Sequence, residues 1–138
     1  MIKPYRRTLL ADLETPVTAY LKLAEKERVS FLLESVERGQ QGRFSIVGVG
    51  ARRIFRLKDG TLTVNGLPMP TQDPLRTLYQ AVHAPMERPP DLPPFFGGVV
   101  GYAAYDLIRH YERLPSLKPD DLNLPDLLFV EPEVVLVF

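Results

Sequence analysis

The segment Val29–Gly48, "VSFLLESVERGQQGRFSIVG", decides how the fold is interpreted. Two apolar runs, Val29–Val36 at its start and Phe44–Val49 across its end, each predict a strand, because they are short and rich in branched and aromatic residues. The charged, glycine-containing stretch between them predicts a loop that joins the two strands as an antiparallel hairpin. The first strand ends with two polar residues, the carboxylate Glu34 and the hydroxyl Ser35. Polar side chains at the end of an apolar strand require a physical explanation.

Two interpretations of this polar strand end are open. Side chains alternate along a strand, so Leu33 and Ser35 share one face and Glu34 lies on the other. In the first interpretation the strand simply leaves the core, since most polar side chains are solvated. In the second, the strand end binds a small molecule with a polar group and an apolar body. Across the loop, Arg43 would then supply a fork for a carboxylate and Ser45 a second hydroxyl.

The remaining sequence predicts an α+β fold with a mainly antiparallel sheet and about three helices packed on it. Helices are expected after Thr15-Pro16 and Asp73-Pro74, because a capping residue followed by proline is a typical helix start. A third helix is expected in "AAYDLIRHYERL". Strands are expected around Leu9–Leu10, on both sides of a tight turn at Asp59-Gly60, and in "FFGGVVGY".

The end of the sequence, "LPDLLFVEPEVVLVF", is an apolar strand that finishes at Phe138. Chain ends are normally surface segments, so one interpretation is that the polypeptide is cut inside a larger fold. The alternative is a terminal strand that docks into the sheet of this chain itself.

Composition excludes several classes of function. The chain has 17 basic and 17 acidic residues, so it lacks the charge excess of a nucleic-acid-binding protein. It has no cysteine, which excludes disulfides and thiolate chemistry. No segment is long and apolar enough to span a bilayer or act as a signal peptide. No nucleic-acid or membrane partner is expected, and a cytoplasmic location is the default.

No catalytic or metal-binding residue is predicted from the motifs. "FFGGVVGY" lacks the lysine of a phosphate-binding loop, so its glycines are expected to permit close packing of a neighbouring backbone. His83 and His110 stand alone, without the spacing of metal ligands. No arrangement typical of a nucleophilic active site is present.

Three motifs in order give the sequence a family resemblance. "ADLETPVTAYLKL", "FLLESVERGQQGRFSIVG" and "PPFFGGVVGYAAYDLIRHYERLP" resemble, in order and spacing, the N-terminal region of anthranilate synthase component I, the large, chorismate-binding subunit of that enzyme. The closing "LNLPDLLFVEPEVVLVF" is also similar to this family, so the resemblance covers essentially all 138 residues. It implies that residues 1–138 form the N-terminal regulatory domain of the larger chorismate-binding enzyme fold. The C-terminal catalytic domain would then be absent from this chain.

The resemblance implies a feedback site for L-tryptophan at the polar strand end. Leu33, Glu34 and Ser35 match the family's L-L-E-S element. Arg43 and Ser45 lie in the neighbouring "GRFSIVG" element, where some members have lysine near the position of Arg43. Part of the family's tryptophan site comes from the catalytic half, so the pocket on this chain would lack one wall.

The resemblance also implies an enzymatic context. The family converts chorismate and ammonia to anthranilate and pyruvate in tryptophan biosynthesis, and a glutaminase partner subunit supplies the ammonia from glutamine. The reaction requires Mg²⁺, held by carboxylates of the C-terminal half, which also binds chorismate. This chain is therefore expected to bind no metal and to be inactive alone. Two alternatives remain: the N-terminal part of aminodeoxychorismate synthase component I, and a stand-alone ligand-binding module.

Overall fold

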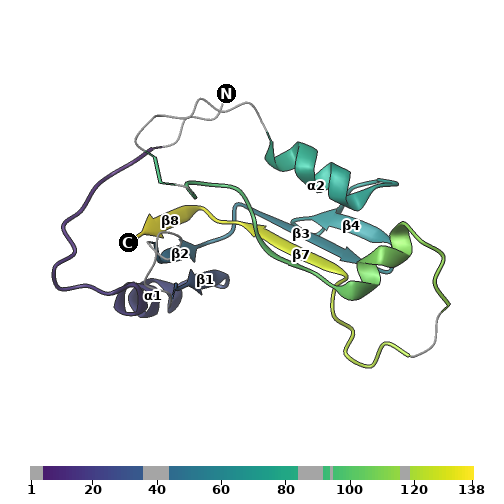
Figure 1. The fold of residues 1–138 in the computed structure, drawn as a ribbon, viewed down its shortest axis with the longest axis horizontal. Helices are drawn as coiled ribbons and strands as arrows, with labels where there is room; N and C mark the ends of the chain where they lie inside the picture. Colours follow the sequence, from purple (N-terminus) through teal and green to yellow (C-terminus); the bar gives the residue numbers. More distant parts are fainter. Residues whose placement is uncertain (1–4, 36–43, 84–91, 94, 116–118) are drawn as a thin grey trace. The chain divides into compact units, whose positions relative to one another are not determined.

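The protein was analysed as a computed structural model that describes residues 5–35, 44–83, 92–93, 95–115 and 119–138. The chain divides into two compact units (Figure 1). The first unit contains the described residues of Met1–Arg52, Ala84–Gly98 and Pro132–Phe138. The second unit contains Arg53–His83 and the described residues of Val99–Glu131.

The first unit is a three-stranded antiparallel sheet with one helix. Its strands are β1 (Ser30–Leu33), β2 (Ile46–Val49) and β8 (Val134–Val137), in the order β1-β2-β8. The helix α1 (Pro16–Ala24) begins as predicted: the Thr15 hydroxyl accepts a hydrogen bond from the Thr18 N–H at 3.1 Å. This cap satisfies an amide that the first helical turn would otherwise leave without a partner.

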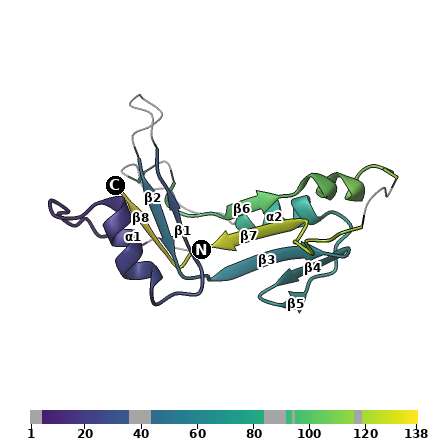
Figure 2. The ribbon, with the colours of Figure 1, turned by 90° about the horizontal axis from the view of Figure 1, so that it is seen from below.

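Helix α1 covers one face of this sheet, and Figure 2 shows it lying against β1 and β2. The Ser30 hydroxyl lies 3.4 Å from the Tyr20 hydroxyl of α1, and Val47 on the same sheet face is fully buried. On the other face, the Phe31 ring lies over Gly48, where a Cβ atom would approach the ring to 2.1 Å. Gly48 therefore makes room for an aromatic ring on the face that also carries Leu33.

The second unit is a five-stranded antiparallel sheet in the order β5-β4-β3-β7-β6. Its strands are β3 (Arg53–Lys58), β4 (Thr61–Val64), β5 (Leu67–Pro68), β6 (Val100–Ala103) and β7 (Leu127–Glu131). Asp59 and Gly60 have φ values of 49° and 73°, which confirms the predicted tight turn between β3 and β4.

One face of this sheet holds the core, together with α2 (Pro74–Val82) and the 3₁₀ helix η1 (Tyr105–His110). Helix α2 starts as predicted, with the Asp73 carboxylate accepting from the Arg76 N–H at 3.0 Å. The buried side chains that form the core come from both helices and three strands: Phe55, Leu57, Leu62, Leu78, Leu107 and Leu127.

Polar side-chain contacts join the helices of this unit to each other and one loop to its sheet. The Tyr111 hydroxyl donates to Asp73 at 2.8 Å, so the end of η1 is joined to the start of α2. Burial, and then this hydrogen bond, raise the pKa of Tyr111, while the bonds from Arg76 N–H and Tyr111 lower the pKa of Asp73. Lys58 is paired with Asp120 and also donates to the Leu124 carbonyl at 2.9 Å.

The α+β class and the antiparallel pairing are confirmed, but several element predictions were wrong in detail. No strand forms at Leu9–Leu10, and both side chains are mostly exposed, because a two-residue apolar run has too little surface to hold a strand in place. The first strand of the hairpin is four residues long rather than the predicted Val29–Val36. The expected third helix is the six-residue η1, in which only Leu107 is buried.

The apolar end of the sequence forms two strands rather than one. Pro132 lies between β7, which pairs with β3 and β6, and β8, which pairs with β2. The terminal strand β8 therefore pairs within a sheet of this chain, which is compatible with both interpretations of the terminal segment.

The packing role predicted for the glycines of "FFGGVVGY" is confirmed at Gly101. A Cβ atom on Gly101 would lie 1.9 Å from the Leu128 carbonyl oxygen of the paired strand β7. We expect Gly101→Ala to lower the free energy of unfolding by about 2 kcal/mol or more, because β6 must shift away from β7. Urea denaturation of the purified chain measures this change.

Gly97→Ala is the matched control for this prediction. A Cβ atom on Gly97 meets no atom within 4 Å, and its φ is not in the left-handed region. We expect a change within about 0.5 kcal/mol. Equal effects of the two substitutions would contradict the close approach of β6 to β7.

Candidate functional site

An open depression in the first unit lies where β1 ends and β2 begins. It has a volume of about 420 Å³ and is lined by Leu32, Leu33, Glu34, Ser35, Phe44 and Ile46. Three of the five predicted site residues, Leu33, Glu34 and Ser35, are therefore together in one concavity. Glu34 and Ser35 are themselves exposed, so the strand end both faces solvent and borders this depression.

The register of the hairpin explains how these residues come together. Strands β1 and β2 pair antiparallel, and their last pair is Leu33 with Ile46. Continued by two residues, the same register places Glu34 beside Ser45 and Ser35 beside Phe44. Leu33 is 46% exposed and Phe44 is 39% exposed, so apolar surface is available beside the two polar side chains.

The two remaining predicted residues have different outcomes. Ser45 is half-buried, is not among the lining residues, and uses its backbone N–H and C=O to pair with Phe138 at 3.1 and 2.9 Å. Arg43 lies outside the described residues, so its predicted role stays a prediction.

Sequence reasoning missed Phe44 and Ile46, which line the depression. The signal was available in the alternation of the second strand. Phe44 and Ile46 lie two residues apart, so they share a face, and antiparallel pairing puts that face next to Leu33. The sequence interpretation placed Ser35 and Arg43 near the same end of the hairpin and named no register for the two strands.

The chemistry of this depression suits a small amphipathic ligand with a cationic group. Glu34 offers a carboxylate, Ser35 offers a hydroxyl, and Leu33 with Phe44 offers an apolar and an aromatic surface. The depression is open to solvent on one side, so a ligand would keep part of its surface in water. Nothing in this donor set suggests bond-making chemistry.

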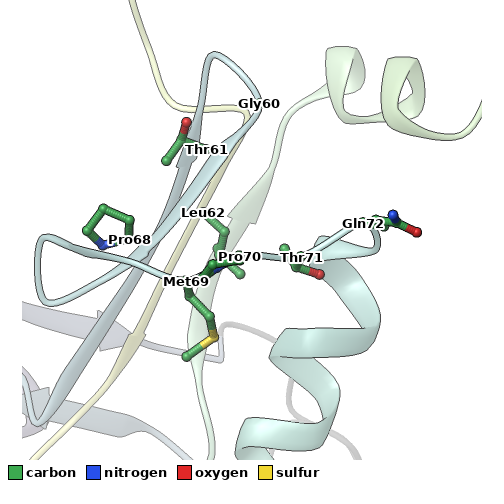
Figure 3. Close-up of a pocket in the computed structure, with 8 residues that line it drawn as sticks. All are labelled: Gly60, Thr61, Leu62, Pro68, Met69, Pro70, Thr71 and Gln72. Carbon is green, nitrogen blue, oxygen red and sulfur yellow. The ribbon is translucent and has the colours of Figure 1, made fainter.

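A second depression, of about 640 Å³, lies in the second unit between the β3–β4 turn and the segment that leads into α2 (Figure 3). Its lining contains no charged side chain and consists of Gly60, Thr61, Leu62, Pro68, Met69, Pro70, Thr71 and Gln72. The Thr71 hydroxyl is already hydrogen-bonded to that of Thr77 at 2.6 Å. This lining therefore offers no charged partner for an ammonium or carboxylate group.

Within the described parts of the chain, no three His, Cys, Asp or Glu side chains are grouped so that they could hold a metal ion. The described residues also include no helix with the length and apolar character needed to cross a membrane.

Comparison with known proteins shows which family this chain resembles. No protein-family model matches the chain. It is 82% identical over 99% of its length to anthranilate synthase component 1 of Thermus thermophilus, and 42% identical over 94% of its length to that of Mycobacterium tuberculosis. The chain spans only 30% and 27% of those two relatives.

A solved structure agrees with the sequence relatives. The crystal structure of anthranilate synthase component I from Streptococcus pneumoniae is 31% identical, with a TM-score of 0.64. The match covers 97% of this chain and 29% of that one. The chain therefore corresponds to the N-terminal region of the anthranilate synthase component 1 family.

Proposed function

We propose that residues 1–138 are the L-tryptophan-binding regulatory part of an anthranilate synthase component 1. The observation that supports this most directly is the depression that brings Leu33, Glu34 and Ser35 together at the end of β1. Its polar and apolar surfaces match the two ends of an amino acid with a large aromatic side chain.

Four of the residues that line the depression have a direct role in this proposal. The Glu34 carboxylate accepts hydrogen bonds from the ligand ammonium, and the Ser35 hydroxyl bonds to its carboxylate. Leu33 and Phe44 contact the indole ring, which prefers aromatic and aliphatic neighbours to water. Arg43 and Ser45 are proposed to complete the polar end, as the family resemblance implies.

The open side of the depression is where the remaining polypeptide of the longer protein would close over the ligand. Until it does so, the indole keeps apolar area in water, and each 100 Å² left exposed forfeits about 2.5 kcal/mol of binding free energy. Feedback inhibition then follows from linkage: tryptophan stabilises the arrangement of the whole enzyme that it binds better, and its differential affinity sets the shift.

In this proposal the whole enzyme converts chorismate and glutamine-derived ammonia to anthranilate and pyruvate in the cytoplasm, as a lyase that works with a glutaminase subunit. Chorismate and the required Mg²⁺ are held by polypeptide outside residues 1–138. The described residues do not fit a magnesium site, since they contain no suitable cluster of carboxylates. No step of the reaction is assigned to this chain.

The purified 138-residue chain should therefore form no anthranilate from chorismate, ammonia and Mg²⁺. The fluorescence of anthranilate measures the product directly. The full-length enzyme under the same conditions is the positive control. Turnover by the chain alone would contradict the assignment of chemistry to the remaining polypeptide.

Calorimetry with L-tryptophan tests the binding site itself. We expect the full-length enzyme to bind tryptophan at least about tenfold more tightly than the isolated chain, a difference of about 1.4 kcal/mol, because the chain supplies only part of the pocket.

The substitution Glu34→Gln in the full-length enzyme should weaken tryptophan binding about tenfold or more relative to the full-length parent. The reason is that it removes the negative charge that pairs with the ligand ammonium.

Indole-3-propionate is the matched ligand control, because it keeps the indole and the carboxylate but lacks the ammonium. Its weak affinity should be unchanged by Glu34→Gln. Tight binding of tryptophan to the isolated chain would favour a stand-alone ligand-binding module. No binding to the full-length enzyme would contradict the regulatory site, and a full-length enzyme that makes aminodeoxychorismate would contradict the family member proposed.

A further inference from the structure

The β2–β8 ladder extends one residue beyond the two strands. The last strand pair is Ile46 with Val137. Beyond it, the Ser45 N–H donates to the Phe138 carbonyl at 3.1 Å, and the Phe138 N–H donates to the Ser45 carbonyl at 2.9 Å. Two reciprocal bonds of this kind define a hydrogen-bonded pair of an antiparallel ladder. Ser45 and Phe138 are therefore held together through their backbones.

Ser45 also lies next to the candidate tryptophan site. Its two chain neighbours, Phe44 and Ile46, both line the depression. The β1–β2 register, continued by one residue, places Glu34 on its other side. Glu34, Ser45 and Phe138 thus form one row of backbone positions across the three-stranded sheet. The start of β2 is shared between the ligand site and the end of β8.

The Ser45–Phe138 backbone bonds hold the last residue of this row against β2. Among the residues that the structure describes, β8 pairs with β2 alone, and it is a four-residue edge strand. Short edge elements open locally at low free-energy cost, which exposes their amides to solvent exchange. A ligand that contacts Leu33–Ser35 on one strand and Phe44 and Ile46 on the other would hold the start of β2 in place. The amide of Phe138 would then open less often.

We propose that occupancy of the tryptophan site is transmitted to the end of β8 through the Ser45–Phe138 backbone pair. The inference rests on the proposed function and adds the route by which the site acts. Ordering of an element by a ligand is sufficient for coupling and needs no change of fold. The Thermus relative is more than three times as long as this chain. In a protein of that length, ordering of the end of β8 would restrict the position of the polypeptide that follows it.

Amide hydrogen exchange on the full-length enzyme, with and without saturating L-tryptophan, tests this route. We expect exchange at Phe138 to slow by about tenfold or more. The matched control is Val137, because the Ile46–Val137 pair is a non-hydrogen-bonded one and its N–H points away from β2. A second control is Met69, whose N–H donates to Leu62 in the other unit, and its exchange should not change.

The outcomes separate this inference from the function on which it rests. Slowed exchange at Phe138 together with Leu33–Ser35 supports the route. Slowed exchange at Leu33–Ser35 alone overturns the route and leaves the binding site standing. Unchanged exchange at both, with no heat of binding in calorimetry, overturns the route and the proposed function together.

Two proline variants test whether the pair carries inhibition. Phe138→Pro removes the amide that donates to Ser45, whereas Val137→Pro removes an amide that makes no bond to β2. We expect Phe138→Pro to bind tryptophan no more than about tenfold more weakly, as reciprocal linkage to the exchange effect requires, while saturating tryptophan leaves a clearly larger fraction of the activity than in the parent. Val137→Pro should be inhibited like the parent. Normal inhibition of a folded Phe138→Pro enzyme would overturn the route, and the exchange experiment decides the question if that variant does not fold.

Discussion

Ser35→Phe in the full-length enzyme should abolish feedback inhibition while leaving anthranilate formation close to that of the parent. Ser35 lines the depression beside Phe44, so a phenylalanine side chain at this position would fill the space that the indole ring needs. We expect the tryptophan concentration for half-inhibition to rise by about a hundredfold, a loss of about 2.7 kcal/mol in binding. Turnover should be preserved, because no catalytic residue is assigned to this unit. Steady-state rates over a tryptophan titration measure both quantities.

The control for this substitution is Thr61→Phe. Thr61 is also an exposed residue, but it lies in the second unit and lines the other depression. This variant should remain fully inhibited. If Ser35→Phe were inhibited like the parent, or if Thr61→Phe lost inhibition instead, the assignment of the site to the end of β1 would be wrong.

Phe55→Ala should be the most destabilising of the single substitutions considered. Phe55 is fully buried in the core of the second unit, and the Arg53 guanidinium lies 5.3 Å from its ring centre. Loss of the ring removes buried apolar area and leaves a cavity, which together cost about 3–5 kcal/mol of unfolding free energy. Urea denaturation of the chain, followed by far-ultraviolet circular dichroism, measures this loss.

Arg56→Ala, at the next position of the same strand, is the control, because the Arg56 side chain is exposed. Its effect should be within about 0.5 kcal/mol. A loss below about 1.5 kcal/mol for Phe55→Ala would mean that the second unit does not depend on the core described above.

The elements that could be predicted from the sequence have strong local signals. Asp59-Gly60 fixes a tight turn because both residues adopt positive φ, and such a turn allows few alternatives. The two α-helix starts at Thr15 and Asp73 were also predictable, because a capping oxygen and a following proline are specified by adjacent residues.

The elements that were mispredicted depend on tertiary partners. Leu9–Leu10 resembles a short strand, but no described strand pairs with it. The segment at Tyr105–His110 has apolar residues at helical spacing, yet it forms a 3₁₀ helix whose start has no side-chain cap. Local pattern alone does not decide such cases, since tertiary packing routinely overrides weak propensity.

The candidate site was predictable only in part, because some of its residues have a local sequence signal and others depend on how the strands pair. Glu34 and Ser35 are conspicuous because they are polar residues at the end of an apolar strand. Phe44 is not conspicuous, since an aromatic residue at a strand start is ordinary. Its place in the site depends on hairpin register, and register is set by the geometry of the connection between the strands. Loop composition predicted a hairpin but not its register.

The central claim is that the concavity at the end of β1 holds an amino acid through Glu34 and Ser35. A crystal structure of the full-length enzyme with L-tryptophan tests this claim most directly. The account predicts the ligand in that concavity, with its ammonium within hydrogen-bond distance of the Glu34 carboxylate and its indole ring against Phe44. Tryptophan bound elsewhere, for example in the depression beside Met69 with Glu34 and Ser35 facing only solvent, would contradict it.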